Sequence, residues 1–286
     1  MRLLLQYSGN RKQAVRVASA AFAAILALGA GTSAWAQSFP NHFDPTSRDS
    51  IAEVEQVPAI RFLTTPDFPP LNYRAANGEL VGFHVDLARA ICEIAEAACT
   101  IQAWPWEQAP DALLDNQGDA LIAGLAITPE TGMRFDFSQI YMMFPGRFVV
   151  QNADRNAFDP RALEGRVISV RGGSGHDLFA TRYLEGAQLA RFETELEALQ
   201  ALEEGGVYAY FGDAMRASFW LNENPDCCAF TPETYFRSDL FGEGLAIAFP
   251  AGQNLVRRTV NAALVQLKRE GMLDELYLRW FPVGFY

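Results

Sequence analysis

A glycine-rich segment at 172–176 carries groups that are suited to binding a small anion. It reads GGSGH and lies between an apolar run and a helical pattern. It resembles the nucleophile elbow G-x-S-x-G, but His176 stands where that motif requires Gly. It also lacks the spacing of G-x-G-x-x-G and the Lys-Ser/Thr ending of a P-loop. Because a strand, a turn and a helix N-terminus present N–H groups outward, Ser174 and Gly175 either contact a carboxylate or belong to a tight turn without a ligand.

Asp213 is the acidic side chain whose position most favours a binding role. It directly follows the apolar strand pattern at 208–211, at the carboxyl end of a predicted strand, where ligands of α/β folds usually lie. Most other acidic residues of so acidic a chain are expected on a solvated surface. Asp213 either caps the next helix or binds a positive group of a ligand, and we favour the second role.

The cysteines indicate disulfides more than a metal site. Cys92 and Cys99 are seven residues apart at the end of a predicted helix, and such a pair can close a short loop in an oxidising compartment. Cys227 and Cys228 are adjacent, and their pairing stays open because a vicinal disulfide is strained. Zinc is disfavoured because the chain has no C-x-x-C and its three histidines have no ligand-like spacing. We therefore expect no metal and no cofactor.

The charge of the chain excludes several classes of partner. Its 286 residues hold 34 acidic and 23 basic side chains, a net charge of −11. Four of the basic residues lie in segment 1–36, which has no acidic residue, so the remaining chain carries an excess of 15 negative charges. Such an excess repels phosphate backbones and anionic lipids, so we expect no nucleic-acid partner.

The first 36 residues have the pattern of a secretory signal peptide. A basic segment at 1–16 precedes an apolar run at 17–28 and the cleavage motif Ala34-Trp35-Ala36. The apolar run is shorter than the roughly 20 residues that span a membrane. We expect cleavage after Ala36 and a mature protein that is exported and not embedded in a membrane.

The remaining chain alternates strand and helix patterns after a polar leader at 37–58. This alternation predicts an α/β fold with mainly parallel sheets, built by one or two domains. The expected strands are 60–64, 100–103, 120–124, 167–170, 190–192, 208–211 and 245–249. The expected helices are 85–98, 109–116, 175–184, 194–204, 213–221, 256–267 and 273–280.

A series of short motifs lies in an order that is more specific than any one of them. They are FPP at 68–70, GFHVDLA at 82–88, Trp106, AGLAITPE at 123–130, DFS at 136–138, Gly173-Ser174, the segment 205–213, and VNAAL at 260–264 through Trp280-Phe281. Over nearly all of residues 59–282 the chain thereby resembles the family 3 bacterial extracellular solute-binding proteins, the polar amino-acid type that serves ABC importers. Members of this family often join two cysteines at the positions of Cys92 and Cys99.

The resemblance implies a two-lobe periplasmic binding protein fold of type II, with the ligand cleft between the lobes. Lobe 1 would comprise residues 59–149 and 243–286, and lobe 2 would comprise residues 150–242. Two hinge-crossing strands would join them near 148–150 and 244–246. Closure of the lobes around a solute is a hinge motion that lets an importer distinguish loaded from empty protein.

The resemblance also implies a ligand site. Phe68 and Trp106 would sandwich the ligand, and Asp213 would pair with its amino group, as a carboxylate shielded from water does well. Gly124 and Ala126 would line the same site. The family commonly has Ser or Thr at the Ala126 position, so this chain lacks that hydroxyl contact.

One substitution makes the ligand uncertain. After Thr-Pro-Glu the family pattern places an Arg that clamps the ligand α-carboxylate, but Thr131 occupies that position here. Thr cannot replace the charge or geometry of a guanidinium. Either Arg134, Arg171 or Arg147 supplies the cation, or the ligand has no α-carboxylate, or the site no longer binds small molecules. From the sequence we favour a ligand without an α-carboxylate.

Three functions fit these observations. The leading hypothesis is a monomeric periplasmic protein, not an enzyme, that captures a small polar or cationic solute for the permease of an ABC importer. The second is an enzyme on the same scaffold, resembling the cyclohexadienyl dehydratases, with Glu107, His176 or Glu243 as acid or base. The third is an accessory protein that docks on another exported protein.

Overall fold

The computed structural model describes residues 55–286. The predicted signal peptide, its cleavage site and most of the predicted leader lie outside the described residues. Within residues 55–286, no helix is both long and apolar enough to cross a membrane.

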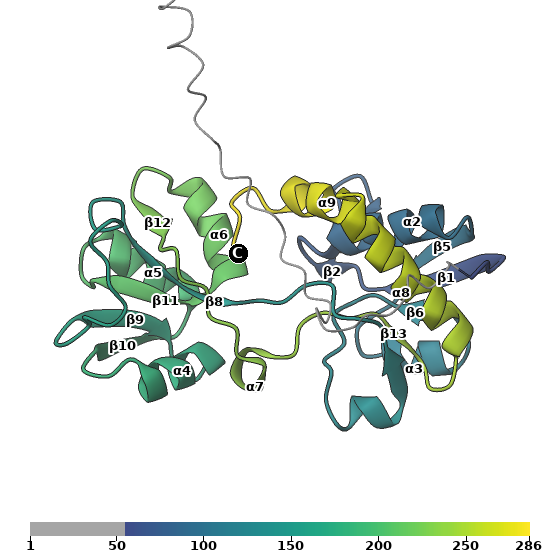
Figure 1. Ribbon diagram of the computed structural model, residues 1–286, viewed down its shortest axis with the longest axis horizontal. Coiled ribbons are helices and arrows are strands. Elements are labelled where there is room, and N and C mark those ends of the chain that lie inside the picture. Colours follow the sequence, from purple (N-terminus) through teal and green to yellow (C-terminus); the bar gives the residue numbers. More distant parts are fainter. Residues whose placement is uncertain (1–54) are drawn as a thin grey trace, which may run out of the picture. The chain divides into compact units, whose positions relative to one another are not determined.

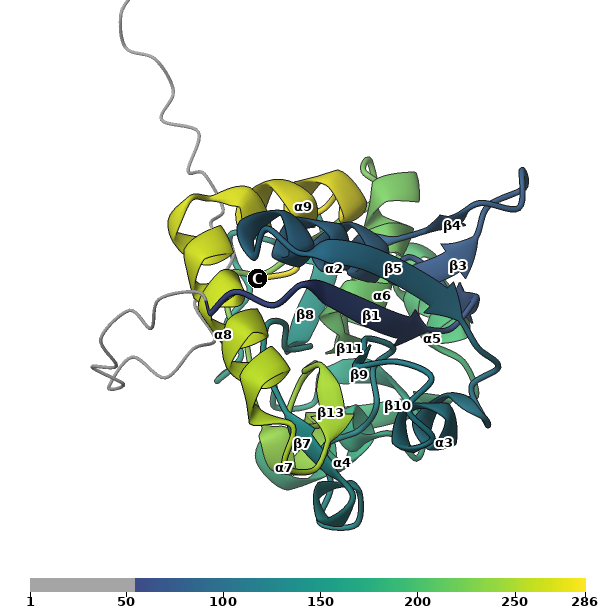
Figure 2. The ribbon, with the colours of Figure 1, turned by 90° about the vertical axis from the view of Figure 1, so that its right-hand side faces the viewer.

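The first sheet has a parallel centre and an antiparallel flank. Its strands, in spatial order, are β5 (Ala98–Ala103), β1 (Ala59–Thr64), β6 (Ala120–Leu121), β13 (Ala248–Pro250) and β7 (Phe135–Phe137). The strands β5, β1 and β6 are parallel, while β13 runs antiparallel to both β6 and β7. Figure 2 shows β1 and β5 side by side, running in the same direction.

The second sheet repeats this plan with different strands. In spatial order they are β10 (Gln188–Phe192), β9 (Val167–Arg171), β11 (Ala209–Asp213), β8 (Gly146–Gln151) and β12 (Cys228–Phe230). Here β10, β9 and β11 are parallel, and β8 is antiparallel to its two neighbours β11 and β12. A third, small sheet comprises β2 (Asp67–Phe68), β3 (Asn72–Arg74) and β4 (Leu80–Val81). The two mixed sheets confirm the predicted α/β class.

Helices connect the strands (Figure 1). They are α2 (Phe83–Ile94), α3 (Ala109–Leu114), α4 (Gly175–Tyr183), α5 (Glu195–Glu203), α6 (Ala214–Glu223), α7 (Ser238–Phe241), α8 (Asn254–Arg269) and α9 (Met272–Trp280), with a 3-10 turn η1 (Thr131–Met133). Three of them start at side chains that accept a hydrogen bond from the first turn, namely Ser174, Thr194 and Asp213. These caps satisfy N–H groups that a helix otherwise leaves unpaired.

Several predicted boundaries differ from the structure, and two of them show the cause. The helix predicted to reach residue 98 ends at Ile94, because Ala98 already begins β5 and pairs with Ala59. The strand predicted at 245–249 is shorter, since β13 covers Ala248–Pro250 and Leu245 forms only an isolated bridge with Met142. In both cases contacts with distant parts of the chain set the end of the element.

The apolar faces of the last two helices are buried. In α8, the side chains of Val260, Leu264 and Leu267 have no exposed surface. In α9, Leu273 and Tyr277 are buried in the same core cluster. The helices α8 and α9 contact each other and α2, and α2 in turn contacts β1 and β5 of the first sheet.

The structure joins Cys92 to Cys99, which confirms the predicted disulfide between the end of α2 and the start of β5. It also joins the adjacent Cys227 and Cys228, whose pairing the sequence left open. The first bridge ties the helix to the edge strand of the first sheet, since β5 pairs on one side with β1.

Replacing both Cys92 and Cys99 with Ala is expected to lower the free energy of unfolding by about 2 kcal/mol, because the bridge closes a short loop in the unfolded chain. Urea denaturation should show a lower midpoint. The matched control is the double replacement of Cys227 and Cys228 with Ala, which removes a loop of minimal length and should cost less. Equal losses in the two variants would contradict this account.

Candidate functional site

The candidate residues gather at the carboxyl ends of the parallel strands of both sheets. We call the ends of β5, β1 and β6 the first-sheet edge, and those of β10, β9 and β11 the second-sheet edge. Phe68, Trp106 and Gly124 follow the three strands of the first-sheet edge. Arg171 and Asp213 are the last residues of β9 and β11 at the second-sheet edge. In α/β sheets, ligands bind outside such edges.

Phe68 lies against the backbone of Gly124 at the first-sheet edge. A Cβ on Gly124 would lie 3.2 Å from Cε1 of Phe68 and 3.6 Å from Cδ2 of Leu245. Gly124 also has a φ of 79°, which favours glycine, so both its space and its backbone exclude a larger residue. Phe68 and Trp106 keep 36% and 41% of their surface exposed, so both rings are available for stacking on a solute.

The loop that contains Thr131 uses the Thr131 hydroxyl for its own structure. Thr131 Oγ1 donates to the carbonyl oxygen of Ala126 at 2.7 Å and accepts from the N–H of Thr128 at 2.9 Å. This pattern fixes the turn that leads into η1. The residue at the family's Arg position thus serves the loop, while Ala126 beside it is exposed.

Two of the three candidate arginines are bound to other parts of the chain. Arg134 forms an ion pair with Asp111 of α3, with 2.5 Å between Nη2 and Oδ1. Arg147 is 5% exposed, donates to the carbonyl oxygens of Thr231 and Tyr286, and lies over an aromatic ring of β12. Burial lowers the pKa of Arg147 to about 10. Neither side chain is positioned as a ready replacement for the missing clamp.

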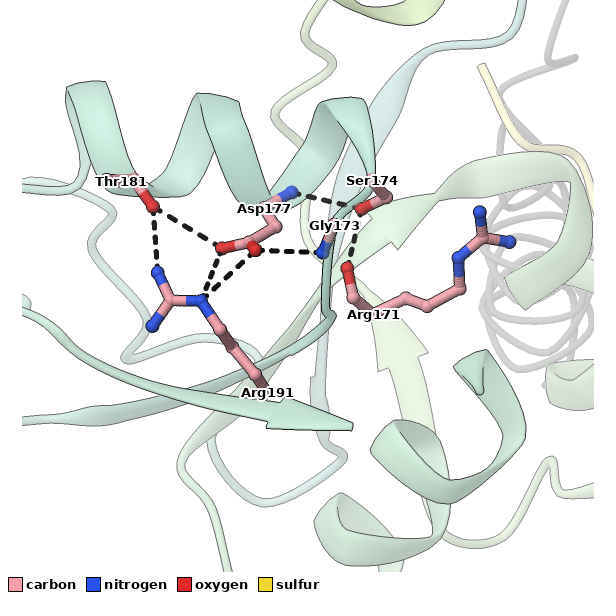
Figure 3. Close-up of polar contacts among 6 residues, drawn as sticks. All are labelled: Arg171, Gly173, Ser174, Asp177, Thr181 and Arg191. Carbon is pink, nitrogen blue, oxygen red and sulfur yellow. Dashed lines mark hydrogen bonds and ion pairs between the residues drawn. The ribbon is translucent and has the colours of Figure 1, made fainter. Parts of the chain in front are cut away.

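The glycine-rich turn satisfies several of its own polar groups (Figure 3). The N–H of Gly173 donates to Asp177 Oδ2 at 3.1 Å. Ser174 Oγ donates to the carbonyl oxygen of Arg171 at 2.7 Å and accepts from the N–H of Asp177 at 3.1 Å. Arg191 Nε donates to both oxygens of Asp177, at 2.9 and 3.1 Å. The turn predicted to hold an anion therefore already holds a carboxylate of its own chain.

Gly175 is covered by another element. A Cβ at this position would overlap the carbonyl group of Leu240, so the start of α4 packs closely on α7. A hollow of about 340 Å³ adjoins the turn and is lined by Gly173, Ser174, Gly175, Asp177, Leu178 and Thr181.

Asp213 takes one of the two roles that the sequence left open to it, that of a helix cap. Its Oδ1 accepts from the N–H of Arg216 at 3.0 Å, which makes it the N-cap of α6. Burial raises the pKa of Asp213, against the opposing effects of the Arg216 N–H and the charges of Arg216 and Arg171. Burial disfavours the ionised form of a carboxylate, and a nearby ammonium group stabilises that form.

Opposite charges surround Asp213 at the second-sheet edge. Glu195, the first residue of α5, forms an ion pair with Arg216 at 3.3 Å. Burial raises the pKa of Glu195, while the charge of Arg216 opposes this rise. The charge of Arg171 also reaches Glu195 and Asp213. The edge therefore combines two acidic and two basic side chains, a suitable lining for a ligand with both signs of charge.

Tyr210 and Gly212 belong to this edge, although the sequence did not single them out. The Tyr210 side chain is fully buried, and within residues 55–286 its hydroxyl has no hydrogen-bond partner. That hydroxyl occupies the space that a Cβ on Gly212 would need, so only Gly fits there. The Gly before Asp213 was the available signal, because a glycine inside a strand often marks a close approach.

The three acid–base candidates differ in their surroundings. Glu107 and Glu243 are exposed. His176 stacks on Phe241, with 4.3 Å between ring centroids, and burial followed by the charge of Arg171 lowers its pKa to about 4. In the described part of the chain, no group of three or more His, Cys, Asp or Glu side chains is placed to hold a metal ion.

Comparison with known proteins places this geometry in context. Residues 60–283 match the sequence profile of the bacterial extracellular solute-binding proteins, family 3. The chain is 28% identical to the L-arginine-binding protein of Pseudomonas aeruginosa, over 77% of this chain and 86% of that protein. It is 27% identical to the ABC transporter arginine-binding protein 1 of Escherichia coli, over 78% and 90%.

A solved structure supports the two-lobe fold. The L-cystine solute receptor of Neisseria gonorrhoeae, in its unliganded open conformation, superposes with a TM-score of 0.68. The superposition covers 79% of this chain and 94% of the receptor. The sequence identity is 20%, and at this level the likeness concerns the fold alone.

Proposed function

Because the chain belongs to the bacterial extracellular solute-binding proteins of family 3, we propose that it captures a cationic amino acid and delivers it to an ABC importer. The two relatives named above are both described as arginine-binding proteins. The position of Asp213 is the observation that carries the proposal. Its carboxylate lies shielded from water at the end of a strand, where a bond to a ligand ammonium group is strong.

The proposed binding mode divides the site between two lobes. Lobe 1, residues 59–149 and 243–286, would supply the rings of Phe68 and Trp106. Lobe 2, residues 150–242, would supply Asp213. A flat cation such as a guanidinium stacks well on aromatic faces, which suits the two exposed rings. Closing the lobes would shield the charge pair from water and strengthen it.

We also propose how the protein reaches the periplasm. Export would remove residues 1–36 by cleavage after Ala36, and the mature chain would act in the periplasm as a monomer. Its partner would be the permease of the importer, which reads the closed form.

A ligand screen tests the proposed function. The mature protein is titrated with L-arginine, L-lysine, L-ornithine and L-histidine, and its thermal unfolding is followed. A true ligand at a hundred times its Kd should stabilise the fold by about 2.7 kcal/mol. A rise of roughly 5 to 10 °C in Tm is expected for a chain of this size. Glycine and L-glutamate serve as controls, because neither offers a second positive group. If no cationic amino acid raises the Tm at millimolar concentration, the proposal is wrong.

A further inference from the structure

Resting on this proposed function, we propose that Arg171 binds the carboxylate of the solute from the second-sheet edge, in place of the cation missing at Thr131. The solute is then an intact α-amino acid and not a decarboxylated amine. This reverses the preference drawn from the sequence, because the structure shows what each alternative group already contacts.

The other groups that could hold a carboxylate already have partners within the chain. The Thr131 hydroxyl is bonded within its loop, to the carbonyl oxygen of Ala126 at 2.7 Å. Arg134 is paired with Asp111, and Arg147 is buried against two carbonyl oxygens. Each of these groups would have to lose a contact before it could bind a solute.

The glycine-rich turn uses its polar groups for contacts within the chain. Its Gly173 N–H binds the Asp177 carboxylate, and its Ser174 hydroxyl is bonded on both sides within the turn. A second carboxylate at this turn would lie beside that of Asp177, and two like charges in contact repel each other. The turn therefore positions the backbone of Arg171 and does not itself receive the anion.

Arg171 differs from the other candidate arginines in its contacts. In residues 55–286, its guanidinium has no hydrogen-bond or ion-pair partner, unlike those of Arg134 and Arg147. Figure 3 shows that it points away from the Asp177–Arg191 pair. Arg171 is half-buried, and only its carbonyl oxygen is held by the turn. A guanidinium in this state retains its full donor set for a bidentate bond to a carboxylate.

Arg171 and Asp213 lie on adjacent strands of the second sheet. Tyr210 of β11 pairs with Ser169 of β9 in parallel register, so Arg171 and Asp213 end neighbouring strands. The charge of Arg171 reaches the Asp213 carboxylate. One basic and one acidic side chain at adjacent strand ends match the α-carboxylate and α-ammonium groups of an amino acid. Lobe 2 would thus bind both charged groups of the solute.

The test compares each amino acid with its decarboxylated amine, namely L-arginine with agmatine, L-lysine with cadaverine and L-histidine with histamine. Calorimetry should show that the wild-type protein binds the amino acid at least about 30-fold more tightly than the amine, as expected when a buried charge pair is lost. Arg171→Gln should weaken binding of L-arginine by about 100-fold and change binding of agmatine by less than about threefold. Arg171→Lys should recover part of the loss, because it keeps the charge without the fork.

Arg166→Gln is the matched control. Arg166 directly precedes the same strand at its opposite end, and its guanidinium lies over the Tyr208 ring. This variant should leave the preference for L-arginine over agmatine unchanged. A wild-type preference for agmatine, or an equal loss for both compounds in Arg171→Gln, would overturn the assignment. Binding of neither compound by the wild-type protein would instead count against the proposed function.

Discussion

Asp213→Asn should weaken binding of L-arginine by about 100-fold, because it removes the charge that faces the solute ammonium group. The variant should still fold normally. Asn is as good an N-cap as Asp, and its side-chain oxygen can accept the hydrogen bond that Oδ1 now takes from the N–H of Arg216. Asn also carries no charge, so it avoids the cost that burial imposes on the ionised carboxylate of Asp213. Calorimetric titration measures the affinity, and thermal unfolding without ligand measures the stability.

Asp213→Ala separates the cap from the charge. This variant should show the same loss of affinity as Asp213→Asn and an additional loss of about 1 kcal/mol in unfolding free energy, since the cap is gone. Unchanged affinity in Asp213→Asn would reduce Asp213 to a helix cap.

Glu197→Gln is a matched control for net charge. Glu197 Oε2 accepts from the N–H of Thr194 at 3.1 Å in the capping box of α5, and Gln retains this bond. The variant loses one negative charge near the same edge but no proposed ligand contact, so its affinity should match the wild type. A loss as large as that of Asp213→Asn would point to long-range charge in place of a specific pair.

The fold was largely predictable because it depends on local patterns. Alternating apolar runs and helical faces indicated the parallel strands and the helices between them. The errors occurred where distant residues decide. Ala98 joins β5 because it pairs with Ala59, and the apolar spacing that suggested a longer helix carries no record of that pairing. The edge strand β12 was not predicted, because it pairs with β8 from a distant part of the chain.

The places of the candidate site residues in the fold were predictable, but the contacts of their side chains were not. Sequence order placed Phe68, Asp213 and Arg171 after strands, and the structure puts each at a carboxyl edge. The contacts that occupy the other candidate side chains could not be predicted from the sequence. Arg147 contacts Thr231 and Tyr286, more than 80 residues away along the chain, so no local pattern records that it is buried.

A buried polar network around His84 shows the same limit. His84 Nδ1 lies 2.7 Å from Oδ1 of Asn72, and His84 Nε2 lies 2.8 Å from the hydroxyl of Tyr141. The amide nitrogen of Asn72 donates to Thr65 twice, so Oδ1 is left to accept from His84 Nδ1–H. Nε2 then accepts from Tyr141. This network of four residues fixes a neutral imidazole with both ring nitrogens satisfied.

Acid is expected to destabilise the protein through this neutral histidine. Burial lowers the pKa of His84 to about 3, whereas an unfolded chain has a His pKa near 6.5. Between these values the unfolded state binds a proton that the native state does not, so stability falls as the pH decreases below 6.5. The loss is up to about 1.4 kcal/mol for each pH unit. His176, whose pKa is lowered to about 4, adds a loss of the same sign.

His84→Gln isolates this contribution. The Gln amide can donate to Asn72 and accept from Tyr141 without titrating, so the variant should lose about 2 kcal/mol less than the wild type between pH 6.5 and pH 4.5. Urea denaturation at both pH values gives the difference. The raised pKa values of Asp213 and Glu195 act in the opposite direction, but they cancel in the comparison because both proteins contain them. Should the variant fold poorly, NMR titration of wild-type His84 provides an independent measurement, and a pKa near 6.5 would refute the account.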